Sequence, residues 1–330
     1  MKAAVVTRYG PPEVVQIADV EKPTPRDNEV LVKVHATTVN RTDSSIVAAE
    51  PVLIRLFYGL VRPRMKVLGN EFAGKVEAVG SGVTSFQVGD RVFGFNTGLF
   101  GVHGEFGAQA DYMVVRGDGA LATIPANLTY EEAAPCMEGS HYALAMVTTT
   151  KIRSGQDVLV NGATGAIGSA AVQLVKNLGA RVTATCPTQH MELVRSLGAD
   201  RVIDHTAQDF TKDYQQYDVV LDAVGKSTFG QCRRLLKPHG IYTSSDGRPW
   251  LQYLILLLIT PLLGGKKVMF AFPRANAATV RHLKELIESG ELKPVIDKRY
   301  SLDQIVEAYR YVGIGQKVGS VVISVDPSNQ

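Results

Sequence analysis

The stretch Val158-Leu159-Val160-Asn161-Gly162-Ala163-Thr164-Gly165-Ala166-Ile167-Gly168 joins an apolar run to a turn with a glycine at every third position. The apolar residues that follow, as far as Leu178, have the spacing of a helix, and residues 181–185 form the next predicted strand. Glycine lets the backbone approach a pyrophosphate, and a helix N-terminus directs free N–H groups toward it. We therefore predict that residues 162–168 of a βαβ unit bind a dinucleotide. The alternative is a glycine-rich turn in another kind of α/β protein.

The first part of the chain has a different pattern. Short β-branched or aromatic runs are separated by Gly and Pro, which is typical of a small barrel-like domain. The expected strands are 2–7, 30–35, 72–79, 91–95 and 110–115.

Beyond residue 157, strands and helices alternate, which predicts a doubly wound parallel sheet. The expected strands are 157–161, 181–185, 201–203, 217–222, 240–244 and 267–272, and the expected helices are 166–178, 189–197, 227–236 and 277–289. Residues 293–330 read as β-like, and we expect this tail to return to the N-terminal domain. The predicted domains are 1–124 with 292–330, and 125–291, and the cleft between them is the expected place for chemistry.

Composition and charge exclude several classes of protein. The 330 residues carry a net charge of only +3, and no basic stripe is interleaved with aromatic residues, so we predict no nucleic-acid partner. Three widely separated cysteines suit a reducing compartment. The N-terminus lacks the apolar core of a signal peptide, so we expect a cytoplasmic protein.

Residues 251–263 are very apolar, but the run is shorter than the roughly 20 residues that span a bilayer, and Pro261 interrupts it. We predict no integral membrane span. We expect a helix buried against the second domain, a subunit partner or a hydrophobic substrate, with shallow membrane association as the alternative.

The end of the second strand predicts the nucleotide. A carboxylate there favours NAD because it binds the ribose 2′-hydroxyl. In this chain no acid occurs before Glu192, and four side chains can donate hydrogen bonds to a 2′-phosphate: Thr185, Thr188, Gln189 and His190. We predict NADPH as the cofactor, with NADH as the alternative.

Several motifs together resemble the medium-chain dehydrogenase/reductase superfamily, and within it the zinc-free quinone oxidoreductase branch. Besides the glycine turn, they are Val39-Asn40-Arg41-Thr42-Asp43, Leu68-Gly69-Asn70-Glu71-Phe72-Ala73-Gly74, Val88-Gly89-Asp90-Arg91-Val92 and Ser196-Leu197-Gly198-Ala199-Asp200. The resemblance covers nearly the whole chain. It implies an α/β protein with a GroES-like β-barrel domain and a Rossmann domain, assembled as a homodimer.

The resemblance also implies a missing metal. Zinc alcohol dehydrogenases of this superfamily have Cys where this chain has Asn40 and His where it has Asn70, and their third ligand falls near Glu138. Zinc prefers thiolate, imidazole or carboxylate, so we predict no metal. A different site made of Glu71, Glu138 and His141 is the alternative, but we interpret the two glutamates as hydrogen-bonding groups.

Without zinc to polarise a carbonyl, substrates that accept hydride more easily fit better. In a quinone or an α,β-unsaturated carbonyl, the negative charge delocalises onto a distant oxygen, which one or two hydrogen-bond donors can stabilise. We therefore predict NADPH-dependent reduction of a small hydrophobic quinone or enone. The alternatives are an NAD-dependent alcohol dehydrogenase and a nucleotide-binding redox sensor or assembly protein without turnover.

The candidate catalytic residues are Asn40, Asp43, Tyr58 and Tyr142, the first two placed near the nicotinamide by the resemblance. Asp43 has an alternative role as a helix cap, and Tyr142 as a packing residue. The candidate cofactor contacts lie in the glycine turn, in later strand-end loops and in the tail: Gly162, Ala163, Thr164, Gly165, Ala166, Ile167, Gly168, Thr185, Cys186, Thr188, Gln189, His190, His205, Val224, Ser244, Phe270, Phe272 and Lys317. Cys186 stands at a helix start, which lowers a thiol pKa, although an inert buried thiol is the alternative.

Overall fold

The computed structural model describes residues 1–96, 107–246 and 249–326. The chain divides into two compact units. Unit 1 comprises Met1–Glu138, Ala275–Glu288 and Pro294–Gln330, and unit 2 comprises Gly139–Arg274 and Ser289–Lys293. Residues 125–138 and 275–288 therefore pack with unit 1, whereas the sequence grouped them with the nucleotide-binding part.

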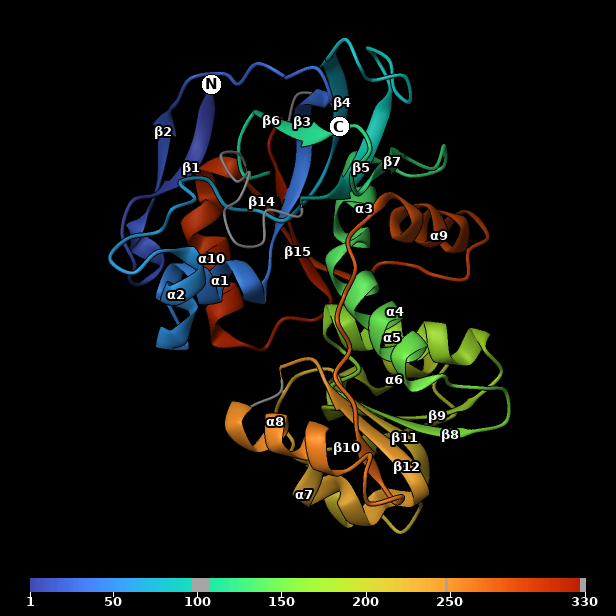
Figure 1. The fold of residues 1–330 in the computed structure, drawn as a ribbon. Helices are drawn as coiled ribbons and strands as arrows, with labels where there is room; N and C mark the ends of the chain where they lie inside the picture. Colours follow the sequence, from blue (N-terminus) through green and yellow to red (C-terminus); the bar gives the residue numbers. More distant parts are fainter. Residues whose placement is uncertain (97–106, 247–248, 327–330) are drawn as a thin grey trace. The chain divides into compact units, whose positions relative to one another are not determined.

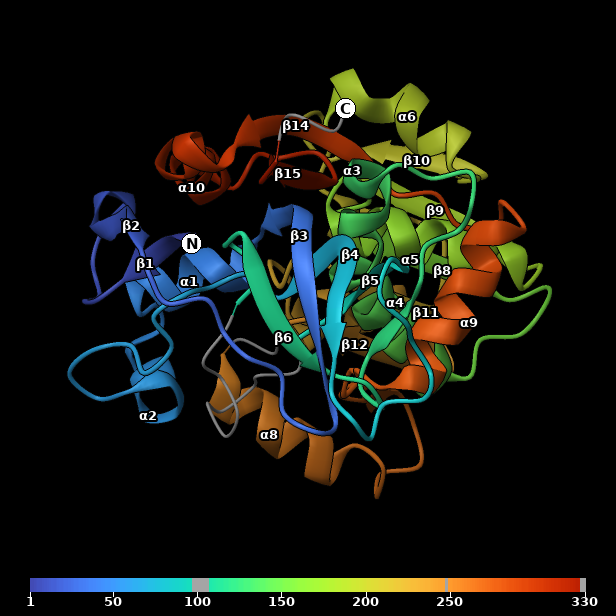
Figure 2. The same cartoon turned by 90° about the horizontal axis from the view of Figure 1, so that it is seen from above.

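Unit 1 is built on a seven-stranded sheet and a separate hairpin. In the sheet, β14 (Ile296–Ser301), β15 (Ser320–Ser324), β3 (Glu29–Val39), β4 (Glu71–Val79), β5 (Arg91–Phe95) and β7 (Leu121–Thr123) follow one another, and β6 (Tyr112–Arg116) also pairs with β3. The hairpin pairs β1 (Lys2–Val6) with β2 (Val15–Asp19). Figure 2 shows β3 between β4 and β6. Since β15 pairs with β3, the tail returns to the N-terminal domain as expected.

Alternation along β3 explains the core of the sheet. Val30, Val32 and Val34 point to the same side, where they pack with Phe72 and Met113 in one buried cluster. A second cluster lies under α10 (Ile305–Ile314), whose buried residues Ile305, Ala308, Tyr309 and Val312 follow helical spacing. The prediction of a β-like tail is thus wrong for residues 305–314. The remaining helices are α1 (Arg41–Ala48), α2 (Arg55–Tyr58), α3 (Tyr130–Ala133) and α9 (Ala277–Glu288).

Unit 2 contains a parallel six-stranded sheet. Its strands are β8 (Asp157–Asn161), β9 (Arg181–Cys186), β10 (Arg201–Asp204), β11 (Tyr217–Asp222), β12 (Leu236–Ser244) and β13 (Lys267–Val268). Their spatial order, β10-β9-β8-β11-β12-β13, reverses direction between β8 and β11. This order is that of the Rossmann fold, in which nucleotides bind where the order reverses. The predicted doubly wound sheet is confirmed.

The helices of unit 2 are α4 (Glu138–Thr150), which begins at the last residue of unit 1, α5 (Ala166–Asn177), α6 (Met191–Ser196), α7 (Phe229–Cys232) and α8 (Trp250–Ile259) (Figure 1). Two predicted elements are much shorter than expected. The helix predicted at 227–236 has a single α-turn and a 3-10 turn before β12 begins. The strand predicted at 267–272 has only two residues. Among the described residues, no helix is long and apolar enough to cross a bilayer.

Candidate nucleotide and substrate sites

The turn between β8 and α5 requires glycine at two positions. Gly162 has a φ of +81°, and a Cβ there would lie 2.3 Å from Val224 Cγ1. A Cβ on Gly168 would lie 2.1 Å from the carbonyl oxygen of Gly162. Real Cβ atoms essentially never lie so close to another heavy atom, and Gly162 in addition has a positive φ. Both glycines are therefore needed to form the turn itself.

Gly165 has a different role. Its φ of −72° is accessible to any residue, and the nearest atom to an added Cβ is Gly162 O at 3.8 Å. It is the N-cap of α5 but has no side chain to accept a hydrogen bond, so the first N–H groups of the helix have no side-chain cap. Free N–H groups and the positive end of the helix dipole make this position an anion site. The space and the donors fit the pyrophosphate of a dinucleotide.

Thr185 supports the turn from the neighbouring strand. Its Oγ1 accepts a hydrogen bond from Gly162 N (3.0 Å) and donates one to Asn161 Oδ1 (2.7 Å). Asn161 Nδ2 in turn donates to Asp222 Oδ1 (3.0 Å). Thr185 is fully buried, and its only proton is engaged. It therefore holds the glycine turn in place and does not donate to a 2′-phosphate, which corrects the role expected from the sequence.

Asp222 organises the loop 222–225 that follows β11, a loop expected from the sequence to reach the cofactor through Val224 but with no role predicted for Asp222 itself. Its Oδ1 accepts from the N–H groups of Val224 (3.3 Å) and Gly225 (3.1 Å), and its Oδ2 accepts from the backbone and hydroxyl of Ser227 (both 2.9 Å). An acid directly after the apolar run Val219-Val220-Leu221 was the available signal. Asp222 positions Val224, one of the predicted cofactor contacts, beside Gly162.

A carboxylate lies in the region predicted to receive the 2′-phosphate. Asp204 ends β10 in register with Cys186, and its carboxylate accepts hydrogen bonds from the hydroxyls of Thr188 and Thr206. These bonds lower the pKa of Asp204 to about 2. Asp204 belongs to the third strand, and parallel pairing brings it beside the end of the second strand, so a search for acids along the second strand alone misses it. Thr188 is thereby engaged. Of the four expected donors, exposed Gln189 and half-buried His190, whose side-chain nitrogens lie 3.3 Å apart, have no carboxylate partner within the part of the chain that the structure describes.

The other predicted cofactor residues of unit 2 follow the carboxyl ends of strands of the same sheet. Burial raises the pKa of the Cys186 thiol to about 11, so the inert-thiol interpretation is the better one. Exposed His205 donates its backbone N–H to Cys186 O (3.2 Å). Ser244 is buried at the end of β12, while the Phe270 and Phe272 rings form an edge contact with centroids 4.6 Å apart.

Unit 1 places Asn40 and Asp43 together in a capping box at the start of α1. Asn40 Oδ1 accepts from Asp43 N (3.2 Å), and Asp43 Oδ2 accepts from Asn40 N (3.0 Å). Asp43 Oδ1 also accepts from Gly69 N (3.2 Å). Asp43 is fully buried, which favours its alternative role as a cap. Asn40 Nδ2 is a buried donor without a partner in the described part of the chain, so Asn40 retains one group for a ligand.

Two buried glutamates lie near this cap. Glu71 Oε1 accepts from the Thr38 hydroxyl (2.7 Å), and its Oε2 accepts from the N–H groups of Met137 (3.1 Å) and Glu138 (2.7 Å). Glu138 Oε1 accepts from the Thr42 hydroxyl (2.7 Å). Burial raises the pKa of both carboxyls, with the negative charge of Glu71 adding to the effect at Glu138. Each glutamate is thus a hydrogen-bonding group, as we interpreted them.

Lys317 and Tyr58 are the remaining candidates in unit 1. The Lys317 ammonium donates to the Gly319 carbonyl, and burial lowers its pKa, opposed by the charges of Glu138 and Glu71. Burial raises the pKa of Tyr58 to about 12, with smaller contributions from Asp43 and Glu138. Tyr58 is therefore a neutral phenol that can donate a proton in a hydrogen bond.

Tyr142 belongs to unit 2. It lies on α4 beside buried His141, and the two ring centroids are 4.7 Å apart. The structure therefore groups Asn40, Asp43 and Tyr58 in unit 1, and Tyr142 with the predicted nucleotide contacts in unit 2. Across residues 1–96, 107–246 and 249–326, no three His, Cys, Asp or Glu side chains are grouped as metal ligands.

A GroES-like unit and a Rossmann sheet with a glycine turn at its switch point define a dinucleotide-binding α/β protein. Comparison with known families agrees: residues 26–126 match the alcohol dehydrogenase GroES-like domain, and residues 197–323 match the family described as zinc-binding dehydrogenase. The chain belongs to the medium-chain dehydrogenase/reductase superfamily and, within it, to the quinone oxidoreductase-like branch.

Relatives resemble the chain over nearly its whole length. The 2-methylene-furan-3-one reductase of Solanum lycopersicum is 30% identical over 337 residues, covering 99% of this chain and 80% of that protein. The chloroplastic NADPH-dependent alkenal/one oxidoreductase of Arabidopsis thaliana is 30% identical, covering 98% and 79%. The solved quinone oxidoreductase of Coxiella burnetii superposes with a TM-score of 0.87 at 25% identity and covers 99% of both chains.

Proposed function

We propose that this protein is an oxidoreductase that uses NADPH to reduce a quinone or an α,β-unsaturated carbonyl without zinc. The observation that carries the proposal is the glycine turn, in which two positions exclude a Cβ while Gly165 leaves open space before uncapped N–H groups. The names of the relatives support the substrate class, because they include a furanone reductase and an alkenal/one oxidoreductase.

Each group in the proposed mechanism has one task. The first turn of α5 binds the pyrophosphate, and the Asp222 loop supports the turn through Asn161. When bound, the nicotinamide supplies a hydride to the electron-poor carbon of the substrate. Asn40 Nδ2 and the neutral Tyr58 hydroxyl are the donors that unit 1 offers to the substrate oxygen, where negative charge develops.

The side chains at the positions of the zinc ligands favour a zinc-independent reaction. Asn40 and Asn70 carry amides, which are poor zinc ligands, and Asn40 Oδ1 is already occupied by the Asp43 N–H. Both oxygens of Glu71 also accept hydrogen bonds. Metal analysis of the purified protein should give less than one zinc per chain. A full equivalent that is lost together with activity on chelation would overturn this part of the proposal.

Stopped-flow oxidation of NADPH tests the reaction directly. We expect rapid oxidation with a panel of quinones and enones, and no reduction of NADP⁺ or NAD⁺ by secondary alcohols. Tight NADPH binding with no oxidation across the panel would favour the redox sensor or assembly protein. Turnover of an alcohol with NAD⁺ would favour the alcohol dehydrogenase.

The proposal includes a homodimer, as the family resemblance implies, and a cytoplasmic location, which the three widely separated cysteines suit. Analytical ultracentrifugation tests the assembly, and cell fractionation with a tagged chain tests the location. One relative is chloroplastic by name, so location varies among similar proteins.

A further inference from the structure

Helix α8 is apolar on two opposite faces. Tyr253, Leu256 and Leu257 have helical spacing and pack on the core of unit 2 with Phe229 and Val268. The Tyr253 hydroxyl donates to Met269 O (2.8 Å). Thr260, which caps the helix, accepts at its Oγ1 from Val268 N (2.9 Å). These contacts fix which face of α8 is turned inward.

The opposite face is equally apolar and is exposed. Leu251, Leu254, Ile255, Leu258 and Ile259 are between 45% and 75% exposed, and Leu262 and Leu263, just beyond the helix, are 84% and 73% exposed. A surface helix normally turns a polar face to water, and a large contiguous apolar patch marks an interaction site. We call these seven side chains the α8 patch.

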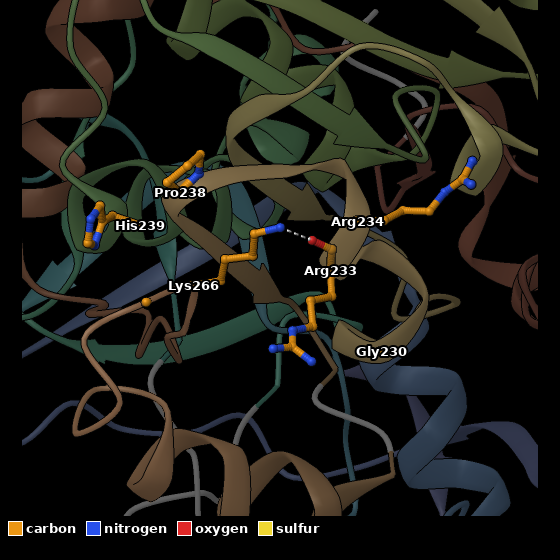
Figure 3. A pocket seen from close by; sticks show the side chains of 7 residues that line it. Gly230, Arg233, Arg234, Pro238, His239 and Lys266 are labelled. Carbon is orange, nitrogen blue, oxygen red and sulfur yellow. Dashed lines mark hydrogen bonds between the residues drawn. The ribbon is translucent and has the colours of Figure 1, made fainter.

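Positive charge gathers at the C-terminal end of the α8 patch. Arg233, Arg234, His239 and Lys266 line an open depression of about 640 Å³ with Gly230, Pro238 and Gly265, and none of these residues is acidic. Figure 3 shows the Lys266 ammonium reaching the Arg233 carbonyl (2.8 Å), so the chain leaving α8 is bound to this basic depression. The depression lies where β12 and β13 begin, at the sheet edge opposite the glycine turn.

The sequence around the α8 patch is also rich in positively charged residues. Residues 223–274 contain eight Lys or Arg and a single acid, Asp246, although the whole chain has an excess of only +3. Apolar side chains beside cations match the interface of an anionic lipid bilayer, where the apolar groups enter the acyl boundary and the cations meet phosphates. We propose that the α8 patch and the basic depression bind this protein peripherally to an anionic membrane surface.

A second copy of the chain is the rival occupant. Two copies packed through the α8 patch would cover the leucines but would offer no acidic side chain to the basic depression, because none of the residues of the patch or of the depression is acidic. A lipid surface complements both the leucines and the cations. Charge therefore favours the membrane.

Co-sedimentation tests the proposal with vesicles of phosphatidylcholine, with and without phosphatidylserine. We expect the chain to bind the serine-containing vesicles and to be released by salt. Flotation of the unmodified chain with the same vesicles on a density gradient is the second measurement. Absence of both sedimentation and flotation would overturn the proposal without any variant.

Two variants assign the binding to these residues. Leu251→Gln/Leu258→Gln/Leu262→Gln should lower the partition coefficient at least about tenfold. Arg233→Gln/Lys266→Gln should lower it about fivefold for each charge, on anionic vesicles only. The matched controls are Val88→Gln/Leu178→Gln/Ile314→Gln, which alters exposed apolar side chains elsewhere, and Lys151→Gln/Arg153→Gln.

Unchanged binding by the leucine variant would refute the assignment. A dimer that the leucine variant dissociates, with no vesicle binding by the parent chain, would show that the occupant is a second copy. If the leucine variant has a raised KM for a water-soluble quinone and the parent chain binds no vesicles, the α8 patch binds the substrate. Each of these results overturns the membrane proposal, and the vesicle-binding and oligomer measurements do not depend on the cofactor assignment.

Discussion

Gly168 and Gly165 stand three residues apart in the glycine turn, and the structure predicts opposite consequences for their replacement. In Gly168→Ala, the new Cβ would lie 2.1 Å from Gly162 O, 2.8 Å from its carbonyl carbon and 2.9 Å from Ala163 Cα. All three atoms belong to the backbone of the turn, so no side chain can move aside. The turn itself must shift.

Two opposing contributions set the change in the free energy of unfolding of Gly168→Ala. Overpacking costs about 1–3 kcal/mol, and contact with backbone puts Gly168→Ala at the upper end. Alanine in a helix returns at most about 1 kcal/mol relative to glycine. We expect a net loss of about 2 kcal/mol in the free energy of unfolding. In Gly165→Val, no atom lies within 3.8 Å of the added Cβ, so only the weaker N-cap is lost, at about 1 kcal/mol or less.

For NADPH affinity, Gly165→Val should have the clear effect that it lacks on stability. The valine of Gly165→Val fills the space in front of the α5 N-terminus, so NADPH affinity should fall by more than about tenfold, or 1.4 kcal/mol. Urea unfolding and calorimetric titration with NADPH measure the two quantities on each variant. Gly313→Val is the control, because Gly313 is also in open space with no positive φ. Wild-type affinity in Gly165→Val, or wild-type stability in Gly168→Ala, would refute the placement of the phosphate loop.

Three further predictions concern side chains. Asn40→Ser keeps an oxygen that can cap the helix but removes the Nδ2 donor without adding a charge beside buried Asp43. We expect kcat to fall about tenfold to a hundredfold while the free energy of unfolding changes by less than about 1 kcal/mol; an unchanged kcat would exclude Asn40 as a donor. Asp204→Asn removes the carboxylate beside Thr188, so NADPH affinity should rise about two- to fivefold while NADH affinity stays constant; equal changes for both cofactors would place the 2′ group elsewhere. Because burial raises the pKa of Glu138, the free energy of unfolding should fall as pH rises above the unfolded pKa of about 4.3. Glu138→Gln should flatten this decline, measured as urea midpoints across pH, whereas the control Glu192→Gln, at an exposed position, should leave it unchanged. An equal decline in Glu138→Gln and the wild type would contradict the burial argument.

Local pattern was enough to predict much of unit 2. The helix expected at 166–178 is α5, Ala166–Asn177, and four strands match to within one residue because apolar runs, glycine and helical spacing act over short stretches. The cap at Asn40 and Asp43 was weighed as an alternative for the same reason, since its two partners are three residues apart. The helix at 305–314 was missed because its apolar spacing was interpreted as part of a β-like tail.

The sequence by itself determined the strand–turn–helix that fits a dinucleotide and the family to which the chain belongs, because these depend on residues close together in the chain. Only the tertiary structure decided what distant residues do to one another. Parallel register brings Asp204 onto Thr188, pairing of neighbouring strands engages Thr185 in the glycine turn, and the packing of Tyr253 and Leu257 leaves the leucines opposite them in water. Such roles depend on which atoms meet across strands and layers, and spacing along the chain does not encode those distances.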